Sequence, residues 1–214
     1  MKERTKQIFD TLYERYPALE CCRESIARAY EIILNCYKNG GTVMICGNGG
    51  SSADCEHIVG ELMKGFMSKR KMTAETAEQF KAVLGDGADE YIEKLQGALP
   101  AISLVSQSGI QTAFANDVDP AMGYAQQVYG YARKGDVVIG ISTSGGAKNV
   151  LHAFNTAKVL GASSVLLSGG TGGVCAKAAD VAIIVPEKET YKVQEYHLPV
   201  YHCLCAVIES EMFE

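Results

Sequence analysis

The sequence contains no tryptophan and no run of about 18 apolar residues, the length that a membrane-spanning helix needs. The first ten residues, MKERTKQIFD, are charged and lack the apolar core of a secretory signal, so we expect a cytoplasmic protein with no membrane partner. An excess of positive charge is also missing, because 20 Lys and Arg stand against 25 Asp and Glu, a formal net charge of −5. We therefore expect no nucleic-acid partner. Small anions remain candidates, since backbone amides bind them.

The eight cysteines do not indicate a disulfide framework. A chain of 214 residues that is 47% hydrophobic can bury a normal core, and we expect one domain over residues 1–214. The cysteines lie in apolar runs such as VMIC and YHCLCAVI. We therefore interpret them as reduced, buried, small hydrophobic residues without a catalytic or metal-binding role.

Five short apolar runs, rich in β-branched residues and bounded by Gly, Pro or Asp, predict strands. They lie at residues 41–47, 100–105, 135–141, 163–169 and 180–186. Helical patterns separate them, beginning with two N-terminal helices over residues 1–39. Strands that are apolar on both faces and joined by helices predict an α/β fold with a doubly wound, five-stranded parallel sheet.

A polar stretch at residues 67–99 interrupts this alternation. Its apolar residues have helical spacing, and Gly85-Asp86-Gly87 divides them, so the stretch predicts an inserted helical hairpin. We consider three roles for it: a cap over a pocket, an enlarged subunit interface, or a surface hairpin packed on the flank of the sheet. Near the other end of the chain, Pro199 predicts a kink in the final helix.

Two turns between a strand and a helix are rich in glycine or hydroxyl groups. Asn48, Gly49, Gly50 and Ser51 follow the first strand, and Ser142, Thr143 and Ser144 follow the third. Amides at a helix N-terminus, helped by hydroxyls, bind phosphate without lysine, and ligands of such sheets bind beyond the carboxyl ends of the strands. The two turns therefore predict an anion site. The alternative is capped helices without a ligand, with Ser51 and Asp54 forming a capping box.

His57 and Glu61 are four residues apart and so share a helix face. This spacing suits a metal ligand pair or an acid and a base acting together. A solvated ion pair is the alternative. His202 lies in an apolar helix, where a hydrogen-bonded core histidine is the alternative to a functional one.

Four motifs in order carry a family resemblance: GNGGSSADCEHIVGEL, FANDVD, GISTSGGAKNV and VQEYHLPVYH. They resemble those of the phosphoheptose isomerases, which have the sugar isomerase (SIS) fold, and the resemblance spans the chain except for residues 67–99. It implies a flavodoxin-like sheet and a homotetramer whose active sites are shared between subunits. It also implies an aldose–ketose isomerase, most simply of sedoheptulose 7-phosphate to D-glycero-D-manno-heptose 7-phosphate through an enediol, without a nucleotide cofactor.

The resemblance also assigns roles to single residues. It makes Glu61 the catalytic base and His202 its acid partner. It places the sugar phosphate on a set of turn and helix residues: Asn48, Gly49, Gly50, Ser51, Asn116, Asp117, Ser142, Thr143, Ser144 and Gln194. A zinc ion (Zn²⁺), found in some members, would be held by His57, Glu61, Gln194 and His202. On a straight helix Gln194 and His202 are separated by about 12 Å and about 80°, so a kink, an irregular helix start or a neighbouring subunit would have to bring them together.

Three positions depart from the family pattern. Ala147 stands where a further serine is usual, Tyr191 where an aspartate is usual, and Lys192 where an arginine is usual. These departures keep two alternatives open. One is a non-catalytic SIS module, either a sugar-phosphate sensor or an adaptor like the one that binds the replication initiator DnaA. Such modules lack the glutamate that Glu61 matches. The other is an isomerase of arabinose 5-phosphate.

Overall fold

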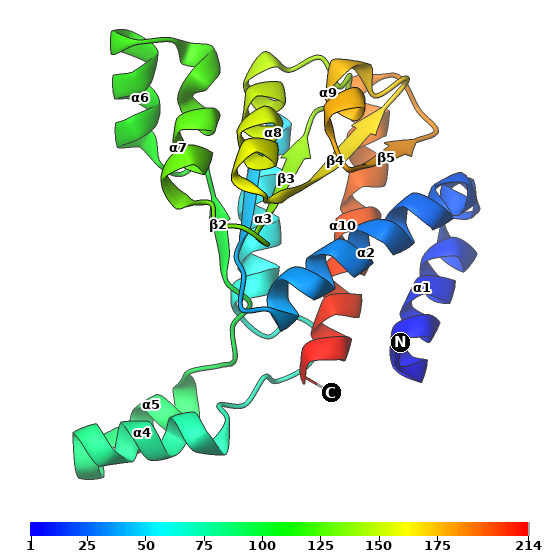
Figure 1. Cartoon of the computed structure of the whole chain (residues 1–214). Coiled ribbons are helices and arrows are strands. Elements are labelled where there is room, and N and C mark those ends of the chain that lie inside the picture. The colour runs from blue at the N-terminus through cyan, green and yellow to red at the C-terminus, as the bar shows by residue number, and fades with distance from the viewer. Residues whose placement is uncertain (214) are drawn as a thin grey trace.

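The computed structural model describes residues 1–213 and contains one parallel sheet of five strands (Figure 1). The strands are β1 (Val43–Gly47), β2 (Ala101–Ser103), β3 (Val137–Ile141), β4 (Ser163–Gly169) and β5 (Val181–Val185). Their order is β2-β1-β3-β4-β5, and every neighbouring pair is parallel. This is the flavodoxin-like order, so the expected fold class is confirmed.

The helices alternate with the strands as expected. They are α1 (Glu3–Arg15), α2 (Arg23–Lys38), α3 (Gly50–Met63), α4 (Ala74–Leu84), α5 (Ala88–Lys94), α6 (Ser108–Asp117), α7 (Gly123–Tyr131), α8 (Lys148–Leu160), α9 (Gly173–Ala178) and α10 (Thr190–Phe213). Short 3-10 helices cover Pro17–Cys22, Gly85–Gly87 and Pro120–Met122. The helix α10 runs as one element through Pro199. No helix within residues 1–213 is both long and apolar enough to cross a membrane.

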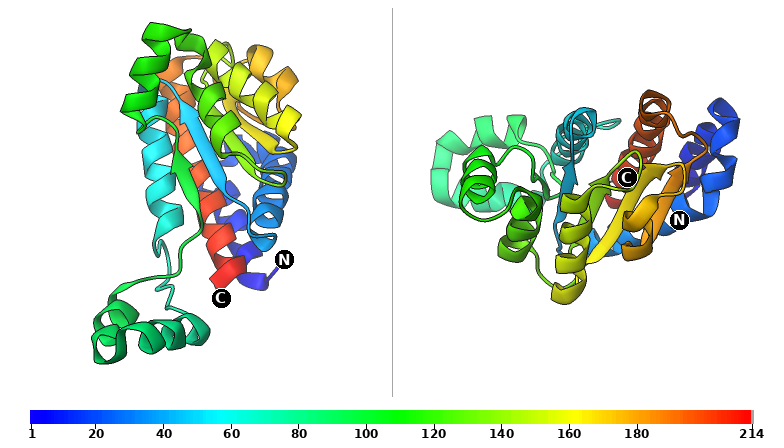
Figure 2. Two further views of the ribbon diagram at one scale, coloured as in Figure 1. Left: turned by 60° about the vertical axis from the view of Figure 1, so that its left-hand side comes forward. Right: turned by 90° about the horizontal axis from the view of Figure 1, so that it is seen from above.

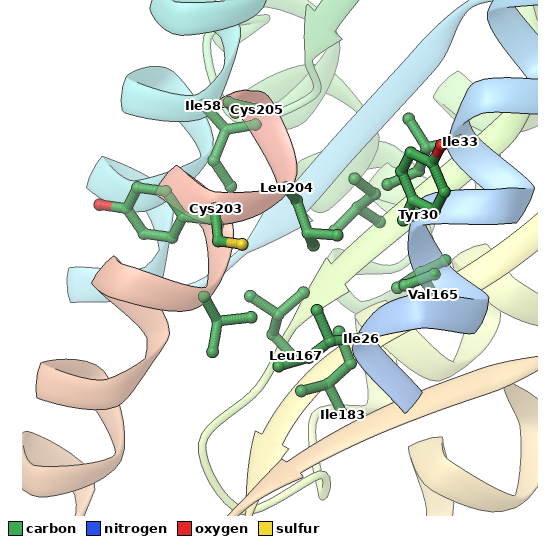
Figure 3. Packing of buried hydrophobic residues seen from close by; sticks show 14 of the residues in the cluster. Ile26, Tyr30, Ile33, Ile58, Val165, Leu167, Ile183, Cys203, Leu204 and Cys205 are labelled. Atoms are coloured by element: carbon green, nitrogen blue, oxygen red, sulfur yellow. The ribbon is translucent and has the colours of Figure 1, made fainter. Parts of the chain in front are cut away.

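Two apolar clusters hold helices against opposite faces of the sheet (Figure 2). One cluster joins α1, α2, α3 and α10 to alternate strand residues such as Val165 and Leu167, and Figure 3 shows Ile33 and Leu204 packed there. The other joins α7, α8 and α9 to the intervening strand residues. Because successive strand residues point to opposite faces, both sets of strand side chains are buried.

All eight thiols are free, and seven of them are buried. Burial raises the pKa of the Cys36 and Cys203 thiols to about 12, so these sulfurs stay protonated and unreactive. Cys21 is exposed, so the expectation that all eight lie in the core is wrong at this position. The reason is local, since Cys21 occupies the outer side of the 3-10 helix while Cys22 faces inward.

The inserted hairpin, which we call the arm (residues 72–95), projects away from the sheet (Figure 1). Its helices α4 and α5 pack on each other, with the Phe80 and Tyr91 rings stacked at 5.7 Å. No residue of α4 is buried, so the helices are confirmed but the expected alternative of packing on the flank of the sheet is wrong. Apolar side chains such as Val83, which is 81% exposed, have no core of their own chain to join.

A buried ion pair anchors the base of the arm. The Arg70 guanidinium donates to Glu209 at 2.7 Å and to the carbonyls of Glu61 and Leu62 at 2.9 and 2.5 Å. Both charged side chains are almost fully buried, at 0% and 1% exposure. Arg70 therefore caps the carboxyl end of α3 and ties that end to α10.

Candidate active site

The two loops that follow β1 and β3 lie side by side. Gly47 and Ile141 end these strands in register, at the point where the strand order reverses. The side chains of Asn48 and Asn149 exchange two hydrogen bonds, of 3.0 and 2.8 Å, and so join the first loop to the start of α8, which follows the second loop. Sequence analysis missed Asn149, because only the fold reveals its pairing with a residue 101 positions away.

The first loop leads directly into α3. Gly49, at φ 57°, is the residue before the helix, and no side chain caps it. The alternative of a capping box is therefore wrong: Ser51 is buried in the first turn, and the Asp54 carboxylate binds Tyr201 instead. Gly50 lies against Gln194, whose amide nitrogen would overlap any β-carbon at position 50. Gln194 thus adds an amide group to the loop edge of α3.

The second loop is a turn between β3 and α8. The amide of Gly145, at φ 66°, donates to the Ser142 carbonyl, whereas α8 begins only at Lys148. The predicted turn between the third strand and the following helix is therefore present, and it holds the three hydroxyl residues. Thr143 is half-buried and Ser144 is exposed, while Ser142 is buried. Two of the three hydroxyl residues remain accessible beside the first loop.

Asn116 and Asp117 lie in the last turn of α6. Both are exposed, and the Asn116 amide donates to the Asp117 carboxylate at 2.8 Å. Among residues 1–213, none of the observed interactions links this pair to either loop. The structure of one chain therefore does not unite these two residues with the other predicted substrate residues.

A cluster of two imidazoles and a carboxylate lies further along α3 and α10. His57 Nε2 is 3.2 Å from Glu61 Oε1 and 3.3 Å from His202 Nε2. The ligating atoms of the three residues lie within 4.8 Å of one another. The His57 side chain is 41% exposed and that of Glu61 is 15% exposed, so solvent reaches the cluster from one side.

The cluster fits a divalent metal ion. Glu61 Oε2 is buried without a hydrogen-bond partner, which is costly unless another group satisfies it. Burial, followed by the neighbouring His57, lowers the pKa of His202, although Glu61 opposes the shift. A neutral imidazole is the form that binds metal, and two histidines with a carboxylate form a ligand set of zinc.

Gln194 is not part of this cluster. It lies against Gly50, and His57 follows seven residues later on α3, which is about 10 Å along the helix axis. The structure thus brings together three of the four residues assigned to the metal. It places the fourth at the loops instead.

A tyrosine that sequence analysis did not single out contacts the cluster. The Tyr201 hydroxyl lies 3.0 Å from His57 Nδ1 and donates to Asp54 at 3.2 Å. The tyrosine and His57 rings meet edge to face, with centroids 5.4 Å apart. Neither contact is visible from sequence spacing, because α3 and α10 are far apart along the chain.

Known proteins resemble this chain over nearly its whole length. SIS domain families match residues 12–98 and 111–205. The phosphoheptose isomerase of Clostridium acetobutylicum is 35% identical over 190 residues, 89% of this chain and 84% of that protein. The Nitratiruptor enzyme of the same name is 37% identical over 88% of this chain and 87% of its own. The solved structure of a phosphoheptose isomerase from Francisella tularensis matches with a TM-score of 0.75 at 26% identity. The match covers 98% of this chain and 100% of that chain.

Proposed function

Since the chain belongs to the phosphoheptose isomerase family of SIS-domain proteins, we propose that it converts sedoheptulose 7-phosphate into D-glycero-D-manno-heptose 7-phosphate. The observation that carries the proposal is the meeting of Glu61 and His202 in one cluster, although they are 141 positions apart in the sequence. A non-catalytic SIS module has no need of a partly buried carboxylate beside two imidazoles.

Isomerisation moves one proton between neighbouring carbons. Glu61 takes the proton from the hydroxyl-bearing carbon beside the carbonyl group and returns it to the former carbonyl carbon. His202 donates a proton to the carbonyl oxygen and recovers one from the neighbouring hydroxyl, so the enediol forms and collapses without net loss of a proton. A neutral imidazole suits this exchange, because it has one N–H to donate and one lone pair to accept.

The loops hold the far end of the substrate. Amides and hydroxyls around Asn48, Thr143 and Ser144 bind the phosphate, and Gln194 adds an amide at the same edge. Binding energy from this remote group fixes the reacting carbons against Glu61. Zinc, when held by His57, Glu61 and His202, supplies Lewis-acid stabilisation of negative charge on a substrate oxygen.

The active form in this proposal is a homotetramer whose sites are shared between subunits. The loops and the cluster lie about 10 Å apart along α3 of one chain, and groups of neighbouring subunits complete the site around them. Exposed Met67 and Leu198 line a groove together with His202 of the cluster. This groove, of about 590 Å³ between α1 and α10, continues from His202 and carries Arg4 and Arg15 on its rim. The acidic arm, with six carboxylates and two lysines, matches such a basic groove on a neighbouring subunit.

The test is proton exchange between solvent and the substrate carbons, measured over ketose and aldose phosphates of five to seven carbons. Glu61→Gln is expected to lower kcat by about 10²–10⁴-fold while sugar-phosphate binding persists. The matched control is Glu56→Gln, since Glu56 lies on the same helix but binds Ser103 and Ser106. Full turnover in the Glu61 variant, or binding without exchange in the unmodified protein, contradicts the proposal.

A further inference from the structure

The Tyr201 hydroxyl lies between two partners of different kinds. On one side is the Asp54 carboxylate oxygen Oδ1 at 3.2 Å, and on the other is His57 Nδ1 at 3.0 Å. Asp54 and His57 lie on α3 and Tyr201 lies on α10, and His57 also belongs to the cluster with Glu61 and His202. The Tyr201 side chain is buried, with 2% exposure, so water does not compete for its hydroxyl group.

The hydrogen inventory determines the direction of both bonds. A carboxylate only accepts, so the single hydroxyl hydrogen of Tyr201 goes to Asp54. The hydroxyl oxygen then has lone pairs to offer His57, and the bond at 3.0 Å requires that Nδ1 carries the hydrogen. In a neutral imidazole the other nitrogen, Nε2, is then the bare one.

We propose that Asp54 and Tyr201 are positioning residues that hold His57 in its Nδ1-protonated form and so aim the Nε2 lone pair at a cation site. The inference rests on the metal-binding role given to the cluster in the proposed function. It adds two side chains behind His57: Tyr201 contacts His57 directly, and Asp54 acts on His57 through Tyr201.

The two tautomers of His57 have different consequences for the cluster. With hydrogen on Nε2, His57 would donate to Glu61 Oε1, 3.2 Å away, and this hydrogen bond would form without an ion. With hydrogen on Nδ1, the bare His57 Nε2 faces the Glu61 carboxylate oxygen Oε1 at 3.2 Å and has no hydrogen to donate to it. That arrangement is unfavourable until a cation enters, so the hydrogen bond to Tyr201 keeps the site ready for one.

The experiment uses the full chain with ¹⁵N-labelled histidine. In the metal-free protein, long-range ¹⁵N–¹H correlation identifies which nitrogen of His57 carries hydrogen. Zinc affinity is measured separately by competition with a chromophoric chelator. The variant Tyr201→Phe keeps the ring and removes only the hydroxyl. The control is Tyr37→Phe, which removes a buried hydroxyl that has no hydrogen-bond partner and lies on α2.

We expect Tyr201→Phe to move the hydrogen of His57 to Nε2 and to weaken zinc binding by about 10–100-fold, as is usual when an outer partner of a metal ligand is lost. Tyr37→Phe changes neither measurement. Asp54→Ala matches the loss in Tyr201→Phe, and the double variant loses no more than either single one, because both residues act through one path.

Two results overturn the inference: His57 keeping its hydrogen on Nδ1 in Tyr201→Phe, or zinc affinity equal to that of the unmodified protein. Additive losses in the double variant overturn it as well. If the unmodified protein binds no zinc, the metal-binding role in the proposed function is wrong. The tautomer measurement still decides whether Tyr201 sets the protonation of His57, so the two failures are distinguishable.

Discussion

Acid is expected to destabilise the fold through one histidine that lies outside the proposed chemistry. His197 on α10 is fully buried, and neither ring nitrogen has a side-chain or backbone partner of normal geometry. Burial lowers its pKa from 6.5 to about 4, and the nearby Ser168 backbone offsets this only in part. Between these two pKa values, His197 is therefore neutral in the folded protein and protonated in the unfolded chain.

The sign and size of the effect follow from the two pKa values. Above pH 6.5 His197 is neutral in both states and has no effect on the pH dependence of stability. As the pH falls from 6.5 towards 4, only the unfolded chain is protonated, so the free energy of unfolding decreases. The full shift corresponds to about 3 kcal/mol, and the part lost between pH 7 and pH 5 is about 2 kcal/mol.

The assay is urea unfolding over this pH range at one fixed protein concentration, because assembly makes apparent stability depend on concentration. The unmodified chain is compared with His197→Phe and His197→Gln, which cannot titrate. Other groups, including His202, titrate in all three proteins, so the difference in pH slope isolates His197. Equal slopes in the three proteins would refute the argument, whatever their absolute stabilities.

Three further outcomes are expected. Arg70→Met leaves the buried Glu209 carboxylate unpaired and lowers the free energy of unfolding by about 3–5 kcal/mol; a loss below about 1 kcal/mol would show that the pair is not buried in solution. The antiparallel bridge of Lys71 and Gln96 allows the arm to be replaced by an Asn-Gly turn. This replacement is expected to lower the oligomeric mass in sedimentation and to raise KM. If neither value changes, the arm has no role in assembly. Asn149→Ala opens the junction between the first loop and α8 and raises KM for the sugar phosphate more than it lowers kcat; the reverse pattern would place Asn149 in the chemical step.

The sheet was predictable because its strands are continuous apolar runs between turn residues. Each of the five expected runs contains a strand; β4 has the expected bounds, and the other four strands are shorter than their runs. The second run covers six residues, whereas β2 covers only Ala101–Ser103, because an edge strand pairs with one neighbour alone. Helix ends were less predictable: Asn116 and Asp117 remain helical although turn residues follow them.

The candidate site was predictable only in its local part. His57 and Glu61 share a face through their spacing, and family resemblance supplied His202. The residues that support them were not visible, because their contacts cross large intervals of sequence. Arg70 reaches Glu209 over 139 positions, and Tyr201 reaches His57 over 144. Such pairs depend on how α3 and α10 are aligned, which no sequence period encodes.

That alignment also explains the awkward spacing of Gln194 and His202. The two helices run in the same direction, so the start of α10 meets the start of α3 and its middle meets the middle. Eight residues on α10 therefore correspond to seven on α3, from Gly50 to His57. One helix pair thus serves both the loops and the cluster, with an amide beside the loops and an imidazole beside the carboxylate. A rigid α10 would keep the two at a fixed separation, which suits a substrate whose phosphate and reacting carbons lie at opposite ends.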